Sequence, residues 1–141
     1  MKYDSLLRSR RIHKQKVSRK QIGQALDRAQ RDLRTAQVLM GQDWDWTFAV
    51  AYDAVLQASR AYMFGQGFRP ASHESHKNTF AFMQLAMGQD YEDLISYFDR
   101  MRNKRNQAIY DMAGLITETE ARSILEKAES FVKVICEQLS E

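Results

Sequence analysis

The chain has 141 residues, of which 44% are hydrophobic, and a formal net charge of +3. This length and apolar content are enough for one domain with a single hydrophobic core. The single cysteine, Cys136, excludes an intrachain disulfide, and no apolar run approaches the ~20 residues that span a bilayer. Because the charged N-terminus also lacks the apolar stretch of a signal peptide, we expect a cytoplasmic protein with no membrane segment.

The first 20 residues concentrate the positive charge, with eight basic residues against one acid, Asp4. We therefore expect residues 1–17 to form a basic N-terminal arm in front of a main domain at residues 18–141. Such an arm is attracted to RNA, DNA or an acidic partner protein. The alternative is a terminus that binds nothing and is kept soluble by its charges. Within it, Leu6, Leu7 and Ile12 predict that part of the arm packs on the body.

Capping signals and glycines divide the remaining chain into helices. Ser18 with Gln21 and Thr117 with Glu120 have the spacing of capping boxes, which open helices. Glycines recur where a helix would end in a left-handed residue. These signals predict helices over residues 19–40, 46–64, 73–87, 91–111 and 118–139.

The spacing of apolar residues supports the same division. In the first and last of these helices the apolar residues recur with a period of 3.6, and no segment alternates as a strand does. The helix at 46–64 is apolar nearly all round, which predicts that it lies centrally or faces a partner subunit. Pro70 is expected in a loop at 65–71. With short connections, the fold class is all-α: an up-and-down bundle of four principal helices plus a shorter one at 73–87.

A cationic segment runs from Met101 to Asp111 near the end of the helix predicted at 91–111, the fourth in chain order. Arg102, Lys104 and Arg105 have no acidic residue between them until Asp111. Arg105 also takes a position that the apolar stripe assigns to the interior, so its guanidinium needs a carboxylate or an external anion. Asp53 in the apolar helix is a candidate carboxylate, and such an internal ion pair is the alternative to ligand binding.

Three short sequences stand out along the chain: a Tyr-Asp-Ala helix, a glycine-bearing loop before two histidines, and an Arg-Asn segment followed by Tyr-Asp. The residues are Ala51 to Ala54, His73, His76, Arg102 to Asn106, Tyr110 and Asp111. With this order of elements, residues 19–139 resemble the HEPN superfamily of small helical proteins. The resemblance implies a bundle that commonly dimerises, with paired motifs lining a cleft, and often a metal-independent ribonuclease toxin paired with a nucleotidyltransferase antitoxin.

The same resemblance implies the site residues. Phosphate would be bound by Arg102, Arg105, Asn106 and Tyr110, with Tyr52, Asp53 and Asp111 in support. Catalytic members resemble one another in an arginine followed four to six residues later by a histidine, and here Tyr110 stands where that histidine would be. A tyrosine with an ordinary pKa of ~10 is a poor proton carrier near neutral pH.

We therefore expect a nucleotide- or RNA-binding protein that is catalytically impaired or non-catalytic. It would belong to a toxin–antitoxin or stress-response pair with a nucleotidyltransferase-like partner, and would form a homodimer. One alternative is a metal-independent ribonuclease in which Arg105 acts with Tyr110 or His76 as the proton carrier. Another is a helical interaction or dimerisation module with no ligand. No zinc-site spacing occurs, and we expect no metal and no cofactor.

Overall fold

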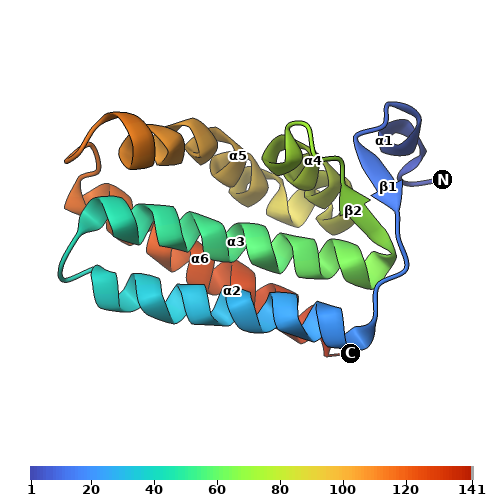
Figure 1. The fold of residues 1–141 in the computed structure, drawn as a ribbon, viewed down its shortest axis with the longest axis horizontal. Helices are drawn as coiled ribbons and strands as arrows, with labels where there is room; N and C mark the ends of the chain where they lie inside the picture. The colour runs from blue at the N-terminus through green and yellow to red at the C-terminus, as the bar shows by residue number, and fades with distance from the viewer. Residues whose placement is uncertain (141) are drawn as a thin grey trace.

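A computed structural model describes residues 1–140 and shows a helical bundle (Figure 1). Long helices α2, α3 and α6 lie side by side, and α4 and α5 cover the other side of α3. The all-α class is confirmed. The elements are α1 (Asp4–Arg8), β1 (Ile12–Lys14), α2 (Arg19–Leu39), α3 (Trp44–Gln66), β2 (Phe68–Pro70), α4 (Ser75–Met87), a 3₁₀ turn η1 (Gln89–Tyr91), α5 (Glu92–Asn106), a π-helical turn η2 (Gln107–Asp111) and α6 (Glu118–Leu139).

Helices α2 and α6 begin at the residues that the capping boxes predict. The side chain of Ser18 accepts from the backbone N–H of Gln21, and Thr117 accepts from Glu120, so both capping boxes are present. The Asp43 carboxylate caps α3 by accepting from the N–H of Trp46 at 3.0 Å. These caps satisfy backbone donors that the first helical turn leaves unpaired.

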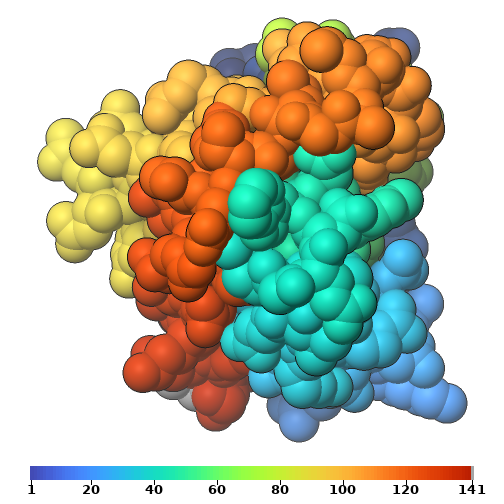
Figure 2. All heavy atoms as spheres, turned by 90° about the vertical axis from the view of Figure 1, so that its left-hand side faces the viewer, coloured from blue at the N-terminus to red at the C-terminus, as the bar shows by residue number. Residues whose placement is uncertain are grey.

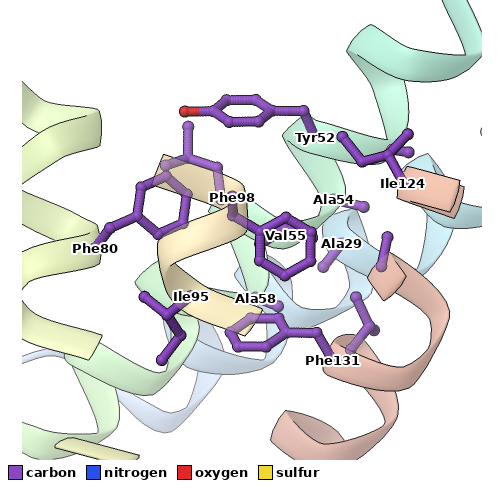
Figure 3. Packing of buried hydrophobic residues seen from close by; sticks show 14 of the residues in the cluster. Ala29, Tyr52, Ala54, Val55, Ala58, Phe80, Ile95, Phe98, Ile124 and Phe131 are labelled. Carbon is purple, nitrogen blue, oxygen red and sulfur yellow. The ribbon is translucent and has the colours of Figure 1, made fainter. Parts of the chain in front are cut away.

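Helix α3 lies at the centre of the core, one of the two positions its composition predicts. It packs against α2 and α6 on one side and against α4 and α5 on the other. Its small residues Ala54 and Ala58 allow close approach, while aromatic rings from α4, α5 and α6 fill the remaining space (Figure 3). Figure 3 also shows Tyr52 at the edge of this cluster, with its hydroxyl turned toward the side on which Phe80 lies.

The N-terminal segment packs on the bundle through α1 and β1. Leu6 and Ile12 are buried, in agreement with the expectation that part of the segment is packed. Strand β1 pairs antiparallel with β2, with Ile12 opposite Pro70. The predictions of no strand and of Pro70 in a loop are therefore wrong: strands of three residues are too short to show alternation, and Pro70 is tolerated because β2 pairs on one side only.

The helix expected to continue through Asp111 is α-helical only to Asn106. The N–H of Met112 donates to the carbonyl of Gln107 at 2.9 Å, which is the i to i+5 bond of a π turn. This extra residue rotates the following side chains, so that Met112 is 56% exposed and Tyr110 is 75% exposed. A continuous α-helical period would place Met112, seven residues after Arg105, on the apolar stripe that faces the core, and the π turn is the reason that it does not lie there. None of the helices within residues 1–140 is long and apolar enough to cross a membrane.

Candidate functional site

Three helices bring most of the predicted site residues together on one side of α3. Helix α3 contributes Tyr52 and Asp53, α4 contributes His76, and α5 contributes the cationic residues near its end. Hydrogen bonds, an ion pair and ring contacts connect these helices. We call this group the polar cluster; its members are Tyr52, Asp53, His76, Arg102, Arg105 and Asn106.

Arg105 is held by partners from its own protomer. One terminal nitrogen donates to Oδ1 of Asp53 at 3.0 Å, and the other donates to Oδ1 of Asn106 at 3.1 Å. The guanidinium carbon lies 5.7 Å from the centroid of the Tyr52 ring, within range of a cation–π contact. The side chain is only 16% exposed. The internal ion pair with Asp53 that the sequence raised as an alternative is therefore present for Arg105.

The pairing of Arg105 leaves one polar atom unsatisfied. Its Nε is buried and has no hydrogen-bond partner. Burial raises the pKa of the Asp53 carboxyl, and the charge of Arg105 opposes that rise. The ion pair thus fixes α5 against α3.

Arg102 differs from Arg105 because it faces a hollow. It lines an open space of about 390 Å³ with Asn106 from its own helix and with His76 and Lys77 from α4. Its only ion pair among the described residues is with Asp99 at 3.4 Å, one turn earlier on α5, and 27% of the side chain is exposed. The third cation of the segment, Lys104, instead pairs with Glu120 of α6.

His76 joins this hollow to the buried Tyr52. Its Nδ1 lies 3.2 Å from the Tyr52 hydroxyl. Burial, and then the charges of Arg60, Arg105 and Arg102, lower the pKa of His76 to about 4. Burial also raises the pKa of the Tyr52 hydroxyl. Both side chains are therefore neutral near pH 7, and the neutral imidazole donates a hydrogen bond through one ring nitrogen and accepts one through the other.

Tyr110 and Asp111 do not join the polar cluster. Both are exposed, and neither is among the residues that line the hollow beside Arg102. The π turn places Tyr110 at the end of the molecule where α3 begins. The resemblance implied that Tyr110 binds phosphate together with Arg102, but within the protomer the two side chains lie apart because the helix changes its period after Asn106.

Several large apolar side chains are exposed near this end of the bundle, the end that faces the viewer in Figure 2. The start of α3 and the loop after α5 meet there, since the Asp45 carboxylate accepts from the N–H groups of Gly114 at 2.6 Å and Ile116 at 3.0 Å. We call it the apolar end; its large exposed side chains are Val38, Trp44, Trp46, Tyr110 and Met112.

Two residues near the polar cluster were missed in the sequence. Lys77 lines the hollow, but nothing in its local pattern distinguished it from an ordinary surface lysine. Arg60 is half-buried on α3 and its charge acts on His76. The signal for Arg60 was available, because it interrupts the apolar helix two turns after Asp53, on the same side.

Comparison with known proteins identifies the family. A family model described as the HEPN domain matches residues 23–139. A search of curated proteins finds no match. The family match covers most of the chain and includes every residue of the polar cluster. The resemblance inferred from the sequence is thereby confirmed, and the chain belongs to the HEPN domain family.

Proposed function

We propose that this protein binds a nucleotide or RNA, and that a phosphate group occupies the hollow beside Arg102. The observation that carries the proposal is the lining of that hollow. Arg102 and Lys77 bring two positive charges from two helices, and the sole carboxylate among its lining residues is Glu74. An arginine fork that is partly exposed binds a phosphate through two parallel hydrogen bonds.

Asn106 and Arg105 support this binding indirectly. Because Oδ1 of Asn106 accepts from Arg105, the amide nitrogen of Asn106 is the group left to donate to a ligand. Arg105, paired with Asp53 and packed on Tyr52, positions Asn106 and holds the end of α5. We therefore assign phosphate contact to Arg102, Asn106 and Lys77, and a positioning role to Arg105, Asp53 and Tyr52.

Metal-independent RNA cleavage is the second candidate function, and one observation favours it. His76 lines the same hollow as Arg102, and the charge of a phosphate bound there would raise its pKa from about 4, at which the imidazole is a weak base, towards neutrality. A neutral imidazole beside a bound phosphodiester can accept the proton of the ribose 2′-hydroxyl, while an arginine stabilises the charge that develops on the phosphate. Tyr110, the other candidate proton carrier, is 75% exposed and has no comparable position within the protomer.

Two protein partners are proposed, a second copy of the chain and a nucleotidyltransferase-like protein, and each is supported by a different observation. HEPN domains commonly dimerise, and the apolar end supplies a surface with two tryptophans that a second copy of the chain could cover. A nucleotidyltransferase-like partner in a toxin–antitoxin or stress-response pair is proposed from the family alone. A helical interaction module without a ligand is the remaining alternative.

Binding and cleavage can be tested with the same protein. Fluorescence anisotropy with a labelled single-stranded RNA, and separately with labelled ATP, should give saturable binding that weakens as salt is raised. Absence of saturable binding at low salt would favour the interaction module. Incubation of RNA with the protein in EDTA tests the second function: cleavage by the wild type that is lost in His76→Gln supports it, and intact RNA contradicts it.

A further inference from the structure

The paired strands β1 and β2 carry positive charge that no carboxylate neutralises. Residues 5–26 hold seven basic side chains and no acid, and residues 54–73 hold two arginines and no acid. In the part of the chain that the structure describes, none of the ion pairs includes Arg69 or a base of the first segment. We call the two strands and their exposed cations the basic ribbon; the cations are Arg10, Lys14 and Arg69.

The pairing of the strands turns one face of the basic ribbon to solvent. His13 lies directly opposite Arg69, and Ile12 lies opposite Pro70. Ile12 is buried, and successive side chains of a strand point to opposite faces, so His13 and Arg69 point away from the core. Arg69 is exposed, in agreement with this direction. The outer face of the basic ribbon therefore presents a guanidinium beside an imidazole.

Strand β2 leads directly to the hollow beside Arg102. Figure 1 shows β2 beside α4, with β1 next to it. Ser72, two residues after the end of β2, lines the hollow. Three residues of extended chain span at most ~11 Å, so the Cα atoms of Arg69 and Ser72 are no further apart than this. The outer face of the basic ribbon and the hollow thus lie close together on the molecule.

The buried side chain of Asn78 fixes this arrangement. Its amide nitrogen donates to the carbonyl of His73 at 2.7 Å and to that of Ala71 at 3.5 Å. Its Oδ1 accepts from Nε of Arg11 at 2.9 Å. The N–H of Ala71 also donates to the carbonyl of Arg11 at 2.9 Å. Both strands are therefore tied to the start of α4, which forms one wall of the hollow.

We propose that the outer face of the basic ribbon binds the backbone of a single strand of RNA, one phosphate of which occupies the hollow beside Arg102. The inference rests on the proposed function and specifies its ligand as an oligonucleotide. One phosphate cannot contact both places, whereas a strand tracks a positively charged surface over several nucleotides. Even at the ~3.4 Å per nucleotide of a stacked strand, eight nucleotides span about 24 Å and so reach from the hollow to Arg69.

Two ligands separate the basic ribbon from the hollow. Uridine 5′-monophosphate carries one phosphate and probes the hollow alone, and an eight-nucleotide oligouridylate probes both. We expect Arg69→Gln and Lys14→Gln each to weaken oligouridylate binding about fivefold, as loss of a solvated charge contact does, and the double variant about twentyfold. Each substitution should lower the salt dependence of this binding by ~0.7 in the logarithmic slope. Binding of uridine 5′-monophosphate should not change.

Two further variants provide controls. Arg102→Gln should weaken both ligands. Arg34 is exposed and in no ion pair of the described residues, like Arg69, but it lies about 22 Å along α2 from the end that follows β1. Arg34→Gln removes the same charge and should change neither ligand. Thermal unfolding of each variant checks that the fold is intact.

An acidic protein segment is the other polyanion that the charge of the basic ribbon would attract. Continuity with the hollow favours RNA, because a phosphodiester strand supplies a phosphate to the hollow as well as charge to the ribbon. An eight-residue polyglutamate should therefore fail to displace labelled oligouridylate. Displacement as effective as that by unlabelled oligouridylate would contradict the proposal.

The outcomes distinguish this inference from the proposed function. If Arg69→Gln and Lys14→Gln bind oligouridylate no more weakly than Arg34→Gln does, or weaken both ligands equally, the role of the basic ribbon is wrong. The proposed function is kept in that case if Arg102→Gln still loses binding. If the wild-type protein binds neither ligand, the proposed function and the role of the basic ribbon are both wrong.

Discussion

Arg105 on α5 donates to Asp53 on α3 at 3.0 Å, and this ion pair joins the last α-helical turn of α5 to the central helix. The pair lies next to the hollow that Arg102 lines, but neither Arg105 nor Asp53 lines that hollow. One arginine of the motif is therefore held by a carboxylate on another helix, whereas Arg102 pairs only with Asp99 of its own helix and lines the hollow.

Removal of the Asp53 carboxylate should destabilise the fold. Asp53→Ala leaves the guanidinium of Arg105 largely buried without its carboxylate, so we expect the free energy of unfolding to fall by about 1–3 kcal/mol. The expected loss is below that of a fully buried pair because a third of the Asp53 side chain is exposed (34%). Urea denaturation measures it. Asp99→Ala, which breaks the more exposed pair with Arg102, should lose no more than about 1 kcal/mol, and equal losses would contradict the assignment.

Stability should depend on pH through His76. The pKa of His76 is about 4 in the folded protein and ~6.5 in the unfolded chain, so between these values the unfolded state binds more protons. The free energy of unfolding therefore falls as the pH is lowered from ~6.5 towards 4.

The variant His76→Gln isolates this contribution. Other groups titrate in the same range, but they are common to both proteins, so the difference between the two pH profiles belongs to His76. Thermal melts followed by circular dichroism between pH 7 and pH 4.5 should show a shallower decline for His76→Gln. Parallel pH profiles for the two proteins would contradict the prediction, because they would show that His76 has the same pKa in the folded and unfolded states.

The loop after α5 should depend on Asp45. Its carboxylate accepts hydrogen bonds from the backbone N–H groups of Gly114 and Ile116. An alanine side chain has no acceptor, so both hydrogen bonds are lost in Asp45→Ala. We expect Asp45→Ala to reduce the free energy of unfolding by about 1–3 kcal/mol. Hydrogen exchange should also speed up at those two amides. Asp111→Ala removes an exposed carboxylate from the same end and should stay within ±0.5 kcal/mol of the wild type.

The apolar end should mediate association if a second copy of the chain covers it. Trp46 is 52% exposed there, so about half of its surface is left uncovered within the protomer. Trp46→Ser should therefore shift a dimer to a monomer in sedimentation equilibrium without loss of helicity. Leu85→Ser, at an exposed apolar residue on α4, serves as the matched control and should leave the oligomeric state unchanged. A wild-type protein that is monomeric at all concentrations would contradict this interface.

Much of this architecture was predictable because local signals agreed with the tertiary structure. The capping boxes at Ser18 and Thr117 satisfy donors within one turn, and the apolar stripes of α2 and α6 face one core. The pairing of Arg105 with Asp53 was also foreseen as an alternative, since a cation on an apolar stripe needs a partner. These features follow from a regular helical period.

The features that were missed depend on departures from that period or on contacts distant in sequence. The π turn at Gln107–Asp111 breaks the α-helical period, so Tyr110 and Met112 point away from their expected positions. The meeting of His76 with Tyr52 depends on how α4 packs against α3, which spacing along the chain cannot give. Strand β1 forms only because β2 lies beside it.

The most direct test of the central claim is RNA binding by Arg102→Gln compared with Arg100→Gln at low salt. Both variants remove one arginine from α5, but only Arg102 lines the hollow. Anisotropy titration with single-stranded RNA should give a dissociation constant at least tenfold higher for Arg102→Gln, since a charge-assisted contact is lost, and within about twofold of wild type for Arg100→Gln. Equal weakening in both variants would show that RNA responds only to total charge and would contradict a phosphate site at Arg102.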